Sequence, residues 1–447
     1  MSDALPLPPR PNLEQYKKLA KDLQQACKSS VSSAIHQWAA RSREMIARLQ
    51  TLEITPQVRK QIHREAEGIE RRWYKFKRLN ERPTRCGLAG VQFFIAREHG
   101  FTSWPKFAKH VQAVARGNSR ISNFEAAADA IVSGDADTLR KLLCDHPGLA
   151  RERSTREHRS TLLHYVSANG IENFRQKTPQ NIVEIATLLL DAGAEVDAES
   201  DAYGGGCTTL GLVATSIHPE QAGVQIALLR TLLERGARLD RPSSAGNRHS
   251  IVTGCLANGQ PKAAEFLANL GAPVDLEGAA ALGRLAEVKS YFDEYGALRP
   301  HTSRQQMESA FEYACWYGQK EVVEFLLERG VDRGWCDTNG KTGLHCAAYG
   351  AHVDLVALLL QHGAPVDAKE KSSRATPLDA ALWVWNNSRD SAARERCYEV
   401  IARLARAGAK LEPQQWSDPC DDRPGILEKI RSDSRMQAAL RGEMPAE

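Results

Sequence analysis

The sequence lacks closely spaced cysteines. Its ten cysteines are scattered along 447 residues, and no C-x-x-C pair occurs. This spacing excludes zinc ribbons, thioredoxin-like sites and iron–sulfur centres, which need neighbouring thiols. We therefore expect small buried thiols in a reducing compartment, with no metal and no cofactor.

Long hydrophobic runs are also missing. No apolar stretch approaches the roughly 20 residues that span a bilayer. The opening MSDALPLPPRPNLEQYKK has no basic start followed by an apolar segment, so it does not predict a secretory signal. The 42% of hydrophobic residues excludes wholesale disorder. These features predict a cytoplasmic protein with no membrane partner.

The common catalytic motifs are absent as well. There is no GxxxxGK[ST], GxGxxG, HExxH or G-x-S-x-G. His345 lies next to Cys346, but adjacent helical side chains point about 100° apart and do not readily form a nucleophile–base pair. We predict no catalytic residue and no enzyme. An enzyme with a cryptic cleft is the third alternative, after the two binding functions described below.

Charge is unevenly distributed. The whole chain has 59 Lys and Arg against 55 Asp and Glu, a net charge of +4. Residues 1–117 contain 22 basic and 10 acidic residues, a local charge of +12. The remaining 330 residues contain 37 and 45, a charge of −8. Two electrostatically different parts have been joined.

The C-terminal three quarters contain a repeat. Seven segment endings have a glycine after an apolar helix: DAGAEVDA, ERGARLD, NLGAPVD, EYGALRP, ERGVD, QHGAPVDA and RAGAKLE. Consecutive glycines lie 25 to 45 residues apart. A glycine in this place suits a helix C-cap with left-handed backbone.

These units resemble the ankyrin repeat, which has a period of about 33 residues and the signature T-P-L-H-x-A. Gly343 replaces the proline in one unit, and Asp379 replaces the histidine in the next. The resemblance implies that His164 and His345 are structural hydrogen-bonding residues. The matching residues are Thr161, Leu163 and His164; Thr342, Leu344, His345 and Ala347; and Thr376, Pro377, Leu378 and Ala381.

A mainly α fold follows from this pattern. No single unit buries its apolar face, so neighbours must stack into a solenoid. We predict an ankyrin-like helical solenoid of about eight units over residues 118–412. A small all-helical basic domain over 1–117 precedes it, and a capping helix and tail over 413–447 follow. Long steps between glycines place insertions at 171–180, 216–223 and 385–396, which are either a functional edge or tolerated loop drift.

The basic N-terminal region is predicted to form five helices. The stretch VQFFIAREHGFTSWPKFAKHVQAV, with the opening LPPRPNLEQYKKLAKDL, resembles a module found ahead of ankyrin repeats in bacterial proteins. This resemblance implies architecture and a bacterial origin, and no chemistry. The helices are expected from residue 13 onward and at about 31–50, 56–79, 87–99 and 104–116.

One helix of this region has a basic stripe that points away from its apolar face. Such a stripe attracts phosphates through charge and counterion release. A nucleic acid, an acidic protein surface that includes the chain's own repeats, and plain solvation are the three alternatives. We expect no aromatic residue to interleave with the stripe, which weakens single-strand binding. The stripe comprises Lys60, Arg64, Arg71, Lys75, Arg78 and Arg82.

Aromatic residues mark a second surface, at the end of the first helix of consecutive units and in nearby fingers. Trp and Tyr are enriched at binding hot spots, although packing between repeats explains them too. We predict a monomeric, non-enzymatic protein–protein interaction scaffold or adaptor with an unidentified protein partner. The alternative is a nucleic-acid-associated regulator that binds phosphate through the basic helix. The aromatic residues are Trp316, Tyr317, Trp335, Tyr349, Trp383 and Trp385.

Overall fold

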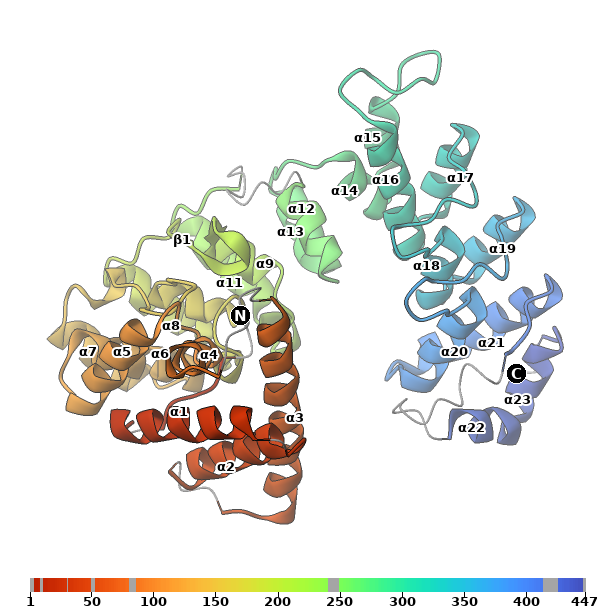
Figure 1. Ribbon diagram of the computed structural model, residues 1–447. Helices are drawn as coiled ribbons and strands as arrows, with labels where there is room; N and C mark the ends of the chain where they lie inside the picture. Colours follow the sequence, from red (N-terminus) through yellow and green to blue (C-terminus); the bar gives the residue numbers. More distant parts are fainter. Residues whose placement is uncertain are drawn as a thin grey trace. The chain divides into compact units, whose positions relative to one another are not determined.

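A computed structural model describes residues 4–8, 11–29, 31–49, 53–79, 86–239, 249–412 and 425–444, and these segments are mainly helical (Figure 1). Contacts divide the chain into two compact units. Unit 1 comprises residues 1–248 and 258–263, and unit 2 comprises 249–257 and 264–447. This division lies within the repeats. The expected domain boundaries at 117 and 412 stay predictions.

Unit 1 begins with the five predicted helices. An apolar stripe on α3, which includes Ile62, Ala66, Ile69 and Trp73, is buried. The Trp73 ring meets Phe94 of α4 edge to face, with centroids 4.9 Å apart. These helices therefore share one apolar core. Their bounds are α1 (Leu13–Lys28), α2 (Ala34–Leu49), α3 (Pro56–Leu79), α4 (Leu88–Glu98) and α5 (Trp104–Arg116).

Three helix pairs complete unit 1, and each first helix packs on the next. A two-stranded antiparallel hairpin, β1 (Glu199–Ser200) with β2 (Cys207–Thr208), forms one finger. The pairs are α6 (Arg120–Ser133) with α7 (Ala136–Asp145), η2 (Leu162–Ser167) with α8 (Ile182–Asp191), and α9 (Thr209–Ala214) with α11 (Gln225–Glu234). Shorter elements are η1 (Leu149–Arg151), η3 (Asn173–Arg175), η4 (Ala202–Gly204) and α10 (Ile217–Gln221).

The pairs continue through unit 2, so the described ranges contain eight in all, as the repeat pattern predicts. Two short helices, α22 (Ile426–Ser432) and α23 (Ser434–Leu440), follow the last pair, and α23 packs on α21. The pairs are α12 (Ile251–Ala257) with α13 (Pro261–Asn269), α14 (Leu276–Ala281) with α15 (Leu285–Ser290), α16 (Arg304–Trp316) with α17 (Lys320–Glu328), α18 (Gly343–Tyr349) with α19 (Val353–Gln361), and α20 (Pro377–Asn387) with α21 (Ser391–Arg406).

The signature histidines are structural, as the resemblance implied. The backbone N–H of Thr342 donates to His345 Nδ1 at 3.1 Å, and His345 Nε2 donates to the carbonyl of Ala375 at 3.1 Å. His345 therefore caps its own helix and holds the next finger. His164 makes the same contacts with Thr161 and with the carbonyl of Cys207. The seven repeat glycines all have φ between 76° and 101°, as their capping role requires.

Gly343 has a steric reason to replace the signature proline. A Cβ at this position would lie 2.8 Å from the Phe311 ring and 2.9 Å from Cys315 Sγ. Both residues belong to α16, the first helix of the preceding unit. Only glycine lets α18 approach α16 this closely, so the close packing of these two helices explains the departure from the signature.

The cysteines depart from the expectation of small buried thiols. Cys27 and Cys86 form a disulfide with Cα atoms 5.7 Å apart, because the end of α1 packs beside the start of α4. Cys144 and Cys336 are exposed. The expectation holds for Cys255, Cys315, Cys346 and Cys397, which are buried; Cys207 is half-buried, and Cys420 lies outside the described residues.

The three expected insertions are ordered in different ways. Residues 171–180 contain η3 and a buried ion-pair cluster described below. Residues 216–223 contain α10. The third insertion is not a loop, because it lengthens α20 to 11 residues and α21 to 16, against 7 and 9 for α18 and α19.

Candidate interaction surfaces

Three aromatic rings form a continuous ladder across consecutive repeats of unit 2. The ring centroids of Trp316 and Tyr349 are 5.6 Å apart, and those of Tyr349 and Trp383 are 6.2 Å apart. These spacings lie within the range of aromatic pairs. Trp383 is 46% exposed, whereas the other two rings are half-buried against the core. We call these three residues the aromatic ladder.

Polar neighbours fix the first ring of the ladder. Lys341 lies over the Trp316 ring, with Nζ 4.8 Å from the centroid. Its ammonium also lies 3.6 Å from Glu312 and 3.9 Å from Asp337. His352 Nε2 donates to the Trp316 carbonyl at 2.9 Å. His352 is therefore a half-buried bridge between repeats.

The other predicted aromatic contacts do not join the ladder. The hydroxyl of Tyr317 donates to the carbonyl of Leu256 at 2.6 Å, which ties two repeats of unit 2 together. Trp335 lies half-buried in its finger. Trp385 is only 5% exposed and packs against Tyr398 of α21. Trp385 is a core residue, because the lengthened α20 turns its side chain toward α21.

The basic stripe of α3 lies in solvent. Five of its predicted residues, Lys60, Arg64, Arg71, Lys75 and Arg78, are exposed. Within the described ranges none of the five forms an ion pair. The sixth, Arg82, lies outside the described residues.

Two residues of this face escaped the sequence analysis. Tyr74 is 43% exposed and lies three residues after Arg71 and four before Arg78, so it shares their face. An aromatic ring therefore does lie within the stripe. Exposed Glu67 lies between Arg64 and Arg71 and interrupts the positive charge. Helical i, i+3 and i, i+4 spacing was the signal that could have found both residues.

The N-terminal helices contact the first finger, residues 152–161 between η1 and η2, through other groups. The backbone N–H of Glu157 donates to the Gly100 carbonyl at 2.9 Å, and His110 bonds Thr155 at 2.8 Å. One partly exposed ion pair, Arg97 with Glu157 at 3.3 Å, accompanies them. None of the five described stripe residues takes part in these contacts.

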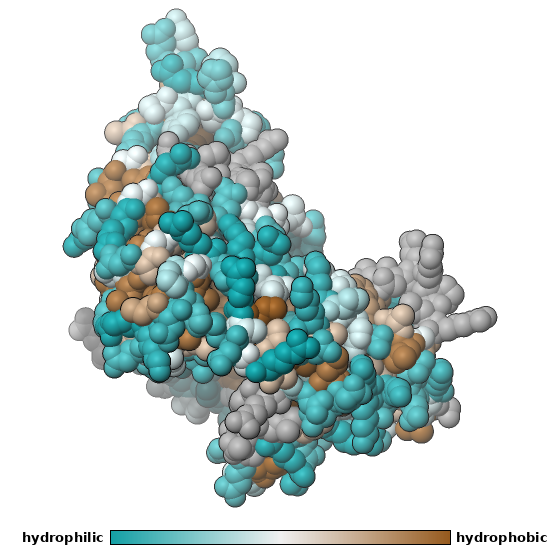
Figure 2. Space-filling model, turned by 90° about the vertical axis from the view of Figure 1, so that its left-hand side faces the viewer, coloured by the Kyte–Doolittle hydropathy of each residue, from teal (hydrophilic) through white to brown (hydrophobic). Residues whose placement is uncertain are grey.

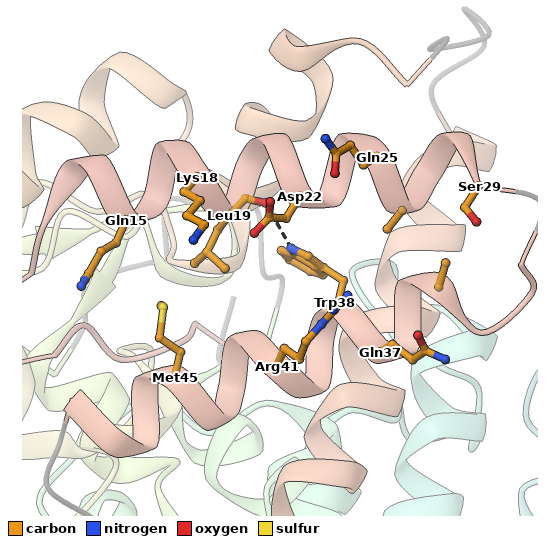
Figure 3. Close-up of a pocket in the computed structure, with 12 residues that line it drawn as sticks. Gln15, Lys18, Leu19, Asp22, Gln25, Ser29, Gln37, Trp38, Arg41 and Met45 are labelled. Carbon is orange, nitrogen blue, oxygen red and sulfur yellow. Dashed lines mark hydrogen bonds between the residues drawn. The ribbon is translucent and has the colours of Figure 1, made fainter.

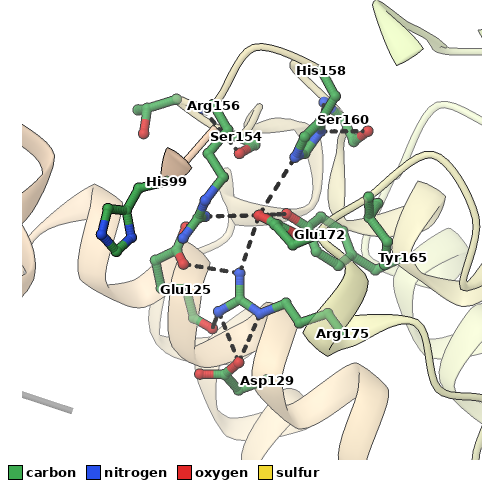
Figure 4. Close-up of polar contacts among 12 residues, drawn as sticks. His99, Glu125, Asp129, Ser154, Arg156, His158, Ser160, Tyr165, Glu172 and Arg175 are labelled. Atoms are coloured by element: carbon green, nitrogen blue, oxygen red, sulfur yellow. Dashed lines mark hydrogen bonds and ion pairs between the residues drawn. The ribbon is translucent and has the colours of Figure 1, made fainter. Parts of the chain in front are cut away.

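A buried ion-pair cluster lies where α6, the first finger and η3 meet (Figure 4). Arg156 NH1 lies 2.7 Å from Glu125 and 2.8 Å from Glu172. Arg175 NH1 lies 2.9 Å from Glu125, and its NH2 lies 2.7 Å from Asp129. The side chains of Arg156 and Glu172 are each 1% exposed. The two buried carboxylates balance the two buried guanidinium groups.

This cluster holds its carboxylates in the charged form. Burial alone would raise the pKa of Glu125, but the charges of Arg156 and Arg175 outweigh it and lower the pKa to about 2. The same guanidinium groups hold the pKa of Glu172 well below its usual range. A pocket of about 260 Å³ borders Glu125. Because both oxygens of Glu125 are bound by arginine, it is a poor general base, and its role is structural.

A groove with a volume of about 640 Å³ lies between α1 and α2 (Figure 3). Its floor contains Leu19 and Trp38, and the Trp38 indole donates to the Leu19 carbonyl at 3.1 Å. Its rim contains Lys18, Asp22 and Arg41, so charges of both signs are present. This mixed rim selects no ligand charge.

The face in Figure 2 is mostly hydrophilic, with hydrophobic residues in small patches.

Two further features of the described ranges bear on function. No group of three or more His, Cys, Asp or Glu side chains there is placed to hold a metal ion. No helix there is both long enough and apolar enough to cross a membrane.

A protein-family model matches the last repeats of the chain. Residues 311–414 match the family model described as ankyrin repeats (3 copies). These residues contain ankyrin repeats. This match covers α17 to α21 and the end of α16, the part that holds all three residues of the aromatic ladder and His352.

Curated relatives match parts of the chain. The serine/threonine-protein kinase TNNI3K of Mus musculus is 29% identical over 147 residues, which is 30% of this chain and 17% of the mouse protein. The NF-kappa-B inhibitor cactus of Drosophila melanogaster is 30% identical over 96 residues, 22% of this chain and 16% of the fly protein. The chain thus spans less than a fifth of the length of either relative.

A solved structure is similar over a larger share. The human ASB11 ankyrin repeat domain is 19% identical, with a TM-score of 0.32, over 64% of this chain and 99% of that domain. Ankyrin repeats, the family matched by residues 311–414, generally mediate protein–protein interaction.

Proposed function

We propose that the chain is a non-enzymatic scaffold or adaptor that holds a protein partner on the aromatic ladder of unit 2. The ladder supports this proposal because Trp383 exposes a large rigid ring at its end. Aromatic residues bury much area at a low cost in conformational entropy, which is why they are enriched at binding hot spots. Lys341, Glu312 and Asp337 supply a polar border next to the apolar rings.

Trp383→Ala offers the cleanest test, since this ring is already 46% exposed and its loss should leave the fold intact. Tyr295→Ala is the matched control, because Tyr295 is an 87% exposed aromatic residue elsewhere in unit 2. Affinity capture from native lysate with quantitative mass spectrometry should show a protein retained by wild type and Tyr295→Ala but lost from Trp383→Ala. Equal retention by all three would reject the ladder.

The second candidate function is a nucleic-acid-associated regulator. Five exposed cations, which form no ion pair with the residues that the structure describes, and the exposed Tyr74 ring on one face of α3 favour it. A gel shift with single-stranded and double-stranded DNA and RNA should weaken steeply with salt, because each neutralised phosphate releases counterions. Charge reversal at Arg71, Lys75 and Arg78 should abolish the shift. A shift that ignores salt or the charge reversal would dispose of this function.

We also propose a cytoplasmic, monomeric protein of bacterial origin. Four buried free thiols support a reducing compartment. The Cys27–Cys86 disulfide is instead typical of an oxidising compartment, so its redox state tests the proposal. Thiol alkylation of protein trapped in intact cells, followed by peptide mass spectrometry, should find Cys27 reduced if the compartment is the cytoplasm. The bacterial origin rests on the N-terminal module alone.

A further inference from the structure

A second groove in unit 1 has a volume of about 720 Å³ and is lined by four separate segments. These are the N-terminal residues 4–6, α2, α3, and residues 173–177 of the insertion. The volume suits a small molecule, for which pockets of about 300–1,000 Å³ are usual. This groove is distinct from the aromatic ladder and, apart from Arg64, from the basic stripe.

Both walls of this groove are held in place. On one side, the Leu5 N–H donates to the Glu98 carbonyl at 2.7 Å, and His99 Nδ1 bonds the Leu5 carbonyl at 2.9 Å. On the other side, Phe174 stacks under the Arg175 guanidinium, 5.2 Å from its ring centroid. Arg175 is itself fixed in the buried ion-pair cluster. A groove with fixed walls loses little conformational entropy when it binds a ligand.

The lining is cationic above an apolar floor. Four cations line the groove: Arg43, Arg64, Arg72 and Lys177, against the single acid Glu65. Arg43 is paired with Glu65, and Arg72 is bidentate to Glu98. Exposed Arg64 and Lys177 form no ion pair within the described ranges. The NH1 group of Arg43 is buried without a hydrogen-bond partner, and such an orphan donor suits an acceptor oxygen.

Gly68 keeps the groove open. It lies in the middle of the 24-residue helix α3, where glycine is less favourable than any residue except proline. A Cβ at Gly68 would meet nothing within 4 Å except the tip of Arg72, at 3.3 Å. Packing in the protein therefore does not require glycine here. A side chain would project into the space beside Arg43 and Arg72.

We propose that this groove binds a small amphipathic anion, with its apolar body on Val58, Ile62 and Pro6 and its carboxylate or phosphate between Arg64 and Lys177. These two exposed cations hold the charged end, and the floor buries the body. Neither a neutral amphipath nor a free inorganic anion satisfies both halves of the lining.

Calorimetric titration of the full chain with decanoate, below its micelle concentration, tests this proposal. Decanoate should bind with 1:1 stoichiometry, and decanol, which has the same tail without the charge, should bind about tenfold more weakly. Sodium acetate should give no saturable heat. Equal affinity for decanol, or no saturable decanoate binding, would overturn the proposal.

Variants then locate the site. The double variant Arg64→Gln/Lys177→Gln should weaken decanoate binding about tenfold or more. Arg71→Gln, on the same helix but outside the groove, should stay within about twofold of wild type. Gly68→Leu fills the groove while improving the helix, so it should abolish binding without lowering the melting temperature. Unchanged affinity in either groove variant would place the ligand elsewhere and refute the assignment.

Discussion

Glu172→Gln should severely destabilise unit 1, because it leaves buried positive charge without compensation. The Glu172 carboxylate lies 2.8 Å from Arg156 NH1 and 3.5 Å from Arg175 NH1. All three side chains are at most 4% exposed, so water cannot replace the lost anion. Removing one partner of a buried ion pair costs about 3–5 kcal/mol.

The magnitude can be measured by differential scanning calorimetry. A change of 1 kcal/mol shifts the melting temperature of a 150–250-residue unit by about 2–4 °C, so the unit 1 transition should fall by about 6–20 °C. Hydrogen exchange at α6 and α8 would assign that transition to unit 1. Glu184→Gln is the matched control. It removes the same charge from a half-exposed pair with Arg140, and such pairs contribute about 1 kcal/mol or less.

A double variant separates charge balance from packing. Arg156→Met/Glu172→Met removes one charge of each sign and leaves Glu125 paired with Arg175. Its loss of stability should be several kcal/mol smaller than the sum of the losses in the single variants Arg156→Met and Glu172→Met, because neither charge is left without its partner. If Glu172→Gln is no more destabilised than Glu184→Gln, or if the two single effects simply add, the cluster does not hold this part of the fold.

Other predictions concern pH and the repeats. Burial lowers the pKa of His99 to about 3 and of His110 to about 4. The unfolded chain therefore binds protons that the folded chain does not, and unit 1 should lose up to about 1.4 kcal/mol per histidine per pH unit as the pH falls below 6.5. Urea midpoints that stay constant from pH 7 to 5 would contradict this histidine effect. The depressed carboxylate pKa values of Glu125 and Glu172 should add a further loss of stability between about pH 4.5 and 2. His345→Ala leaves the Thr342 N–H and the Ala375 carbonyl unpaired and should cost unit 2 about 2–4 kcal/mol in urea unfolding, whereas exposed His362→Ala should change little. Gly343→Pro restores the ankyrin signature, yet it should cost about 1–3 kcal/mol through overpacking against Phe311. The double variant Gly343→Pro/Phe311→Leu should recover part of this stability. A Gly343→Pro variant that is more stable than wild type would refute the steric argument.

Sequence reasoning succeeded where a few local residues decide the structure. Thr342 and His345 are three residues apart, so their cap follows from helix geometry. The repeat glycines likewise report a local φ requirement. The eight helix pairs and the five N-terminal helices were predictable for the same reason, because apolar periodicity is a local signal.

Other features depend on contacts between distant segments, which local patterns do not encode. The partner of Cys27 is 59 residues away. The insertion at 171–180 could be located from repeat spacing, but the burial of Glu172 and Arg175 depends on α6 and the first finger. The clash that excludes proline at Gly343 comes from the preceding unit. Trp385 was misassigned because the lengthened α20 decides which way its ring points.

The basic stripe is the feature that the fold itself explains least. Lys75 lies four residues after Arg71 and three before Arg78, and like charges at these spacings each destabilise a helix by about 0.2–0.5 kcal/mol. The repeats do not compensate for this cost, because the first finger meets Arg97 and not the described stripe. Lys75→Glu would replace repulsion by attraction to both arginines, which changes each pair by about 0.4–1 kcal/mol, so it should stabilise unit 1 by about 0.8–2 kcal/mol.

The same change should weaken binding of a polyanion such as heparin, if the stripe is retained for an external anion. Thermal unfolding and heparin-column elution of Lys75→Glu would show the two effects in opposite directions. Glu67→Gln is the complementary variant, since it removes an acid that lies between Arg64 and Arg71: it should lower stability slightly and delay elution. If Lys75→Glu stabilises unit 1 and heparin elution does not change, the stripe is a solvated face, and the nucleic-acid function falls with it.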